Sequence, residues 1–283
     1  MSRTNLTIGF PMREVTLSGG SWTSARPITR ADALPLSDPA RSADAELAST
    51  QFVASLDEGT RPVGCVAICD HNLSLGAKVR IRLLDSGDTE LADSGWVDAW
   101  PEVYGAFSLD WGDPSFMSLR PAANELEQEI STFVHLFETT RISASVEVSI
   151  DDTENADGYV EIGFVGVAGA TEVTINPSYG LREGFSQRSR VQVSEGGVRT
   201  VERRNKPRTL SGELIMVTGE RRSLIDRMQR EADLDKPFII VQEPGEALFK
   251  PLTQWLAFFS ELSPGERAYY GYDRQPISFE QVL

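Results

Sequence analysis

Short segments of alternating apolar and polar residues, ended by glycine- or aspartate-rich turns, recur through residues 50–165. The clearest is Lys78–Leu84, in which every second residue is Val, Ile or Leu. Residues 145–150 repeat the alternation, and residues 63–69 form an apolar run of strand length. A period of two places successive side chains on opposite faces of a strand, and short apolar runs are typical of buried strands. The pattern predicts a β-sandwich.

The rest of the chain follows a different pattern. A Glu-Gly-Gly turn separates residues 190–194 from residues 198–201, which predicts a hairpin. Residues 220–233 carry apolar side chains at helical spacing and predict one amphipathic helix. Further strands are expected at residues 209–217, 238–241, 254–262 and 267–272. The overall prediction is a mainly β protein, with a jelly-roll β-sandwich over residues 1–168 and a small α+β domain over residues 169–283.

Charge is divided unevenly between these two parts. The chain has 42 acidic and 27 basic residues, a net charge of −15. Residues 1–168 hold 26 acidic and 11 basic residues, and residues 169–283 hold 16 of each. The division indicates two domains with different surroundings, and the acidic total disfavours nucleic acid as the main partner.

Two stretches lack clear periodicity. The first fifty residues are rich in Ser, Ala, Pro and Asp, so we expect irregular connections with short strands, and a disordered N-terminal arm that orders on assembly. The aromatic-rich residues 96–116 are expected to form long loops, followed by a short helix at residues 124–130.

The two cysteines, Cys65 and Cys69, fall on one predicted strand. Their Cα atoms would lie roughly 13 Å apart, which is too far for a disulfide. We expect buried reduced thiols; a zinc site with His71 is the alternative, although it lacks a fourth ligand. No apolar stretch reaches membrane-spanning length, and the N-terminus has no apolar core typical of a secretory signal, so the chain is expected to be made in a cytoplasm.

Several short motifs resemble minor structural proteins of tailed bacteriophages. They are Ser18-Gly-Gly-Ser-Trp22, Leu34-Pro-Leu36, Ala40-Arg-Ser42, Ser49-Thr-Gln-Phe52, His71-Asn-Leu-Ser74, Asp93-Ser-Gly-Trp96, and Asp151-Asp152 with the run Asn155 to Gly163. In that group the first domain is similar to a discoidin or galactose-binding-like jelly roll. The second domain, with its basic hairpin, helix and Lys236-Pro-Phe-Ile-Ile240 strand, resembles the tail-tube fold.

The resemblance implies a distal-tail or tail-tip component of the virion. The C-terminal domain would form a cyclic ring with copies of itself and contact other tail proteins. The jelly roll would face outward and serve attachment to a fibre or to a host-surface glycan.

Four aromatic residues are candidates for sugar stacking: Trp96, Trp100, Tyr104 and Trp111. Aromatic faces suit the apolar face of a pyranose, and loops at the end of a sandwich are a common place for such sites. The alternative is that the rings pack in the core or against a neighbouring subunit.

The acidic turn at residues 151–158 is the candidate metal site. Aligned with a calcium-binding loop, it puts Asn155 and Asp157 at ligand positions, but Phe164 stands where the final glutamate belongs. The alternative to calcium is a solvated hairpin turn rich in Asp and Asn; no other cofactor is predicted.

A basic stretch is the candidate subunit interface. It comprises Arg199, Arg203, Arg204, Lys206 and Arg208. The first alternative is pairing with acidic neighbours, the second is a plain exposed face, and the third is contact with DNA in a tail lumen.

Catalytic motifs are missing from the sequence: it contains no nucleophile elbow, phosphate-binding loop, dinucleotide fingerprint or zinc-protease motif. The leading hypothesis is therefore a non-enzymatic tail protein. A carbohydrate-binding adhesin is the second, and a wall hydrolase, for which carboxylates abound but none stands out, is the third.

Overall fold

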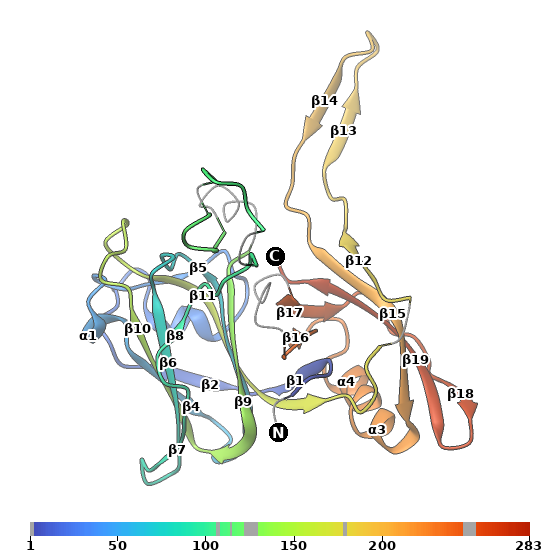
Figure 1. The fold of residues 1–283 in the computed structure, drawn as a ribbon, viewed down its shortest axis with the longest axis horizontal. Helices are drawn as coiled ribbons and strands as arrows, with labels where there is room; N and C mark the ends of the chain where they lie inside the picture. The colour runs from blue at the N-terminus through green and yellow to red at the C-terminus, as the bar shows by residue number, and fades with distance from the viewer. Residues whose placement is uncertain (1–2, 106–107, 114, 122–129, 178–179, 246–252) are drawn as a thin grey trace. The chain divides into compact units, whose positions relative to one another are not determined.

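The computed structural model describes residues 3–105, 108–113, 115–121, 130–177, 180–245 and 253–283. The protein is mainly β, with antiparallel strand pairing, as predicted (Figure 1). It divides into two compact units: unit 1 contains residues 1–172 and 238–256, and unit 2 contains residues 173–237 and 257–283. A single domain boundary was expected after residue 168. In the structure the chain passes from unit 1 to unit 2 after residue 172, but residues 238–256 belong to unit 1 again. The predicted helix at residues 124–130 lies largely outside the described residues.

Unit 1 is built on two sheets. One has the order β2-β4-β10-β6-β7, with β8 paired to β6; the bounds are β2 Val15–Ser18, β4 Phe52–Leu56, β6 Lys78–Leu84, β7 Glu90–Asp93, β8 Val97–Asp98 and β10 Ser145–Asp151. The other has the order β16-β1-β11-β5-β9, with β3 paired to β11; the bounds are β1 Thr7–Met12, β3 Ala40–Arg41, β5 Arg61–His71, β9 Thr132–Ser143, β11 Glu161–Glu172 and β16 Phe238–Val241. A 3-10 helix (Ile28–Asp32) and the short helix α1 (Leu47–Thr50) lie in the connections.

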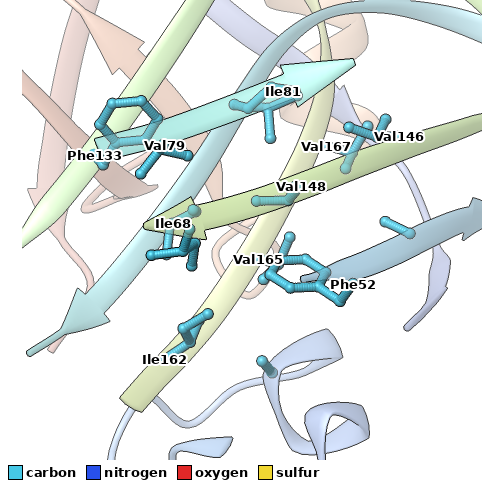
Figure 2. Close-up of a cluster of buried hydrophobic side chains, with 14 of the residues drawn as sticks. Phe52, Ile68, Val79, Ile81, Phe133, Val146, Val148, Ile162, Val165 and Val167 are labelled. Carbon is cyan, nitrogen blue, oxygen red and sulfur yellow. The ribbon is translucent and has the colours of Figure 1, made fainter. Parts of the chain in front are cut away.

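The core of unit 1 lies between these sheets. Figure 2 shows aliphatic and aromatic side chains from both sheets packed together, among them Phe52, Ile68, Ile81 and Val165. Strand β6 alternates between buried and half-exposed residues, whereas β5 is buried through most of its length. The alternating sequence of β6 therefore marks a strand with one buried face, and the apolar run of β5 marks a strand buried on both faces.

Unit 2 has one helical region and a set of antiparallel strands. Strand β15 (Arg208–Val217) pairs along its whole length with β19 (Tyr272–Gln281); β12 (Arg182–Phe185) pairs with β15, and β18 (Glu266–Tyr269) with β19. Strand β17 (Gln254–Phe259) begins in unit 1 and ends in unit 2, where it pairs with β19. The helical residues bury Leu224, Ile225, Met228 and Ala232, the face that the spacing predicted.

Three local expectations were wrong, and a fourth was right only in part. Residues 7–12 are not part of a disordered arm: β1 lies between β11 and β16, and its Ile8 and Phe10 are buried. The single helix is two, α3 (Thr218–Ser223) and α4 (Ile225–Glu231), separated at Leu224, whose ψ is −72°. Of the strand expected at residues 267–272, residues 267–269 lie in β18 and residue 272 begins β19, with a turn at Tyr270 and Gly271 between them. Finally, residues 151–158 do not join paired strands, because β10 and β11 belong to different sheets.

Candidate interaction surfaces

The predicted hairpin is exposed along its whole length. Strands β13 (Arg190–Val193) and β14 (Arg199–Glu202) pair antiparallel and form a separate two-stranded sheet, which extends away from β12 and β15 (Figure 1). We call residues 186–207 the arm; its base closes where the Ser186 N–H donates to the Pro207 carbonyl at 2.9 Å. Every residue from 190 to 206 is exposed.

The two faces of the arm differ in chemistry. Val191 lies opposite Val201, and Val193 lies opposite Arg199, so these four side chains share one face. The other face carries Arg190 opposite Glu202 and Gln192 opposite Thr200. Val191, Val193 and Val201 are between 39% and 66% exposed. The first face, here the valine face, is an apolar strip edged by an arginine, with no covering segment among the described residues.

The basic residues predicted as an interface fall on or beside this arm. Arg199, Arg203, Arg204 and Lys206 are exposed, and Arg208 is half-buried at the base, in β15. Arg204 pairs with Glu202 at 2.8 Å, and Arg188 pairs with Glu280 of β19 at 2.6 Å. The arm contains six basic and two acidic residues, so its surface is strongly positive.

The four aromatic candidates do not form one surface. Trp100 is only 4% exposed, and its indole N–H donates to the Leu73 carbonyl at 2.8 Å inside the core. Tyr104 is half-buried, Trp96 is 44% exposed and Trp111 is 89% exposed. The Trp100 ring therefore has a packing role and no free face for a sugar; glycan binding at the other three residues stays a prediction.

Trp111 belongs to a loop that we call the Trp111 loop, residues 108–113 and 115–119. Its ring packs against Phe116, with ring centroids 5.1 Å apart. The Leu119 carbonyl accepts the Val103 and Tyr104 N–H groups at 2.9 and 3.1 Å and closes the loop. Met117 is 88% exposed, and the carboxylates of Asp110 and Asp113 are exposed beside Trp111. The loop therefore presents two exposed apolar side chains and two exposed carboxylates.

The acidic segment 151–160 crosses between the two sheets and is held by Asn72. The Asn72 amide donates to Asp157 Oδ2 at 2.9 Å and to the Tyr159 carbonyl at 3.1 Å, and its Oδ1 accepts the Glu161 N–H at 2.7 Å. Asn155 donates to the buried carboxylate of Asp152 at 2.7 Å. Asn155 and Asp157 thus contribute to a hydrogen-bonded crossing.

No group of three or more His, Cys, Asp or Glu side chains among the described residues is placed to hold a metal ion. Burial raises the pKa of Cys69 to about 12 and that of Cys65 further, so both thiols are protonated. Burial also lowers the pKa of His71 to about 3. The burial predicted for the cysteines is confirmed, and the zinc alternative is not supported in the described part of the chain.

Unit 1 contains a pocket of about 260 Å³ that the sequence did not predict. It lies between residues 97–101 and strand β9, with the buried Gln254 and with Pro244 on its wall. Its lining comes from three distant segments, so no local pattern pointed to it.

Across the described residues, no helix is both long and apolar enough to span a membrane.

No protein-family model matches the chain, and no curated protein sequence matches it. Among solved structures, the lectin domain of lectinolysin complexed with Lewis B antigen matches with a TM-score of 0.37 and 16% identity, over 56% of this chain and 94% of that one. The family 32 CBM from C. perfringens NanJ in complex with galactose matches with a TM-score of 0.37 and 16% identity, over 58% and 99%. A Streptococcus pneumoniae fucose binding module matches with a TM-score of 0.34 and 14% identity, over 55% and 90%. These are β-sandwich carbohydrate-binding domains, and at such scores the likeness carries no assignment of family or activity.

Proposed function

We propose that this chain is a non-enzymatic structural protein that assembles with copies of itself through the arm. The observation that carries the proposal is the exposed valine face of β13 and β14. A two-stranded hairpin is only marginally stable alone in water, and buried apolar surface contributes roughly 25 cal/mol per Å². A neighbouring subunit that covers this face would therefore supply the stability that the arm lacks.

The base of the arm supports the same proposal. The four-residue pairing of β12 with β15 and the Arg188–Glu280 ion pair tie the arm to the long β15–β19 ladder of unit 2. An arm held at its base loses less conformational entropy on docking than a free segment. The sheet of unit 2 thus serves as a platform for a docking element.

The finer part of the proposal is a place in the tail of a bacteriophage, in the distal tail or tail tip, within a closed ring. It rests on the sequence motifs quoted above and on the pairing of a β-sandwich with a hairpin-bearing α+β unit. Homotypic rings are a common result of one surface docking onto a different surface of the next copy. Other tail proteins would be further partners, and the virion its location.

Shortening the arm tests the proposal. Replacing residues 187–206 by Asn-Gly keeps the β12–β15 pairing and closes it with a two-residue hairpin turn. We expect light scattering to give a mass of several chains for the wild type and of one chain for the shortened variant. Tyr270→Ser, at the exposed tip between β18 and β19, is the control and should assemble like the wild type. A wild-type protein that stays a monomer at all concentrations would overturn the proposal.

A second candidate function, carbohydrate binding by unit 1, is favoured by one observation: Trp111 holds an almost fully exposed indole ring in an irregular loop. Its ring is supported from one side by Phe116, so the opposite face is available for stacking. A glycan array probed with wild type and with Trp111→Ala tests this function. Binding lost in the variant supports it, and silence across the host's surface glycans counts against it.

A further inference from the structure

We infer that the arm of one copy docks onto the Trp111 loop of a second copy. This inference rests on the proposed function and names the acceptor surface that the function leaves open. Both surfaces combine apolar side chains with charge, and their charges are opposite. The arm offers three valines among arginines, and the loop offers the exposed Trp111 and Met117 together with the exposed Asp110 and Asp113.

The charge balance of the arm favours a partner on unit 1. The six basic residues of the arm outnumber its two acidic ones, and Arg199 and Arg203 are exposed, with no ion pair to an acidic side chain among the described residues. The chain's net charge of −15 equals that of residues 1–168, which contain the Trp111 loop. A basic arm and an acidic loop attract one another at distance and repel copies of themselves, which sets the polarity of the contact.

The apolar chemistry also matches. Arg199 lies on the valine face, directly opposite Val193, so a ring that covers the valines also meets a guanidinium. An arginine over the face of an indole is a favourable cation–π contact. Trp111 and Met117 are 89% and 88% exposed, which is unusual for residues of their size. Trp and Arg are the residues most enriched at the centres of protein interfaces.

Charge reversal tests this acceptor. One variant reverses two charges of the arm and makes its net charge zero (Arg199→Glu and Arg203→Glu), and the other reverses both carboxylates of the loop (Asp110→Lys and Asp113→Lys). We expect each variant alone to lose self-association by at least about tenfold in dissociation constant. Mixing the two should restore assembly, because the reversed arm of one then meets the reversed loop of the other. Restoration on mixing also shows that both variants are folded.

Matched controls reverse charges elsewhere: Arg222→Glu on α3 and Glu154→Lys in the 151–160 crossing, both of which should assemble like the wild type. If the loop-reversed variant self-associates normally while arm shortening still abolishes assembly, this inference fails and the proposed function stands. If the mixture stays monomeric, the inference is also overturned. The same result would follow if the arm and the loop met within one chain, because mixing two variants cannot restore such a contact. If arm shortening leaves assembly intact, the proposed function itself fails.

Discussion

The Arg221 Nε–H donates to Asp273 Oδ2 at 2.7 Å and joins helix α3 to strand β19. The Asp273 side chain is 2% exposed, and the Thr218 hydroxyl donates to its second oxygen at 3.2 Å. A second nitrogen of the same guanidinium donates to Asp226 of α4 at 2.7 Å. Arg221 therefore connects both helices of unit 2 to the sheet that carries the arm.

Replacing Asp273 tests the importance of this connection. The Arg221 guanidinium holds the pKa of Asp273 below its usual value of 3.8, so the ion pair stabilises the fold above that pH and is lost as pH falls below it. We expect Asp273→Asn to lower the unfolding temperature at pH 7, and the difference from wild type to shrink below about pH 3.8. The control is Glu231→Gln, which removes an exposed helix pair and should have little effect. Equal unfolding temperatures at pH 7 would contradict the account.

His71 gives a second pH dependence of stability, which comes from burial of a neutral side chain and not from an ion pair. The unfolded chain takes up a proton near pH 6.5, whereas burial keeps the folded His71 neutral down to about pH 3. Stability is therefore lost as pH falls from about 6.5 toward 3, by about 1.4 kcal/mol per pH unit from this group. We expect His71→Gln to flatten that slope in urea unfolding between pH 7 and pH 5. Identical slopes for the two proteins would show that His71 takes up its proton while folded.

The tryptophans of the aromatic set should separate by stability. Trp100 is buried and donates a hydrogen bond to Leu73, so Trp100→Ala is expected to cost about 3–5 kcal/mol of unfolding free energy. Trp111 is exposed, and Trp111→Ala should stay within about 0.5 kcal/mol of wild type. Urea unfolding measures both. A stable Trp100→Ala protein would show that this ring is dispensable for the core, and would return it to the list of candidate ligand residues.

The crossing at residues 151–160 should depend on Asn72 and not on calcium. Asn72→Ala removes three hydrogen bonds and is expected to lower the unfolding free energy by about 1–3 kcal/mol. Both carboxylate oxygens of Asp152 accept hydrogen bonds from Ser74, so protein groups already occupy the acceptors that a calcium ion would need. We therefore expect calcium and a chelator to give the same unfolding temperature. A rise with calcium would restore the metal-site prediction.

Elements whose structure is set by residues near one another in the chain could be predicted from the sequence, and elements that depend on distant strands could not. Strand β6 falls at the residues predicted, because burial of one face imposes a period of two on Lys78–Leu84. Strand β1 was missed, since its six residues include Gly9 and Pro11, and its partners β11 and β16 are distant in the chain. The exposed hairpin was predicted from its Glu-Gly-Gly turn, which acts locally.

The candidate surfaces were predictable only in part. Aromatic spacing could not show that Trp100 turns into the core while Trp111 stays outside, because that depends on the Leu73 carbonyl and on loop closure at Leu119. The acidic segment was read as a hairpin turn, because nothing local reveals that β10 and β11 pair with strands in different sheets. Composition did locate the basic arm, since charge is a property of the sequence itself.

Hydrogen exchange in the arm is the most direct measurement of the central claim. The backbone amides of residues 190–202 lie in an exposed two-stranded hairpin, which exchanges quickly unless another surface covers it. We predict that these amides become protected as wild-type protein is concentrated into its assembly, while amides in the β15–β19 ladder keep the same protection. Rapid exchange of the arm at every concentration would contradict docking of the arm onto another subunit.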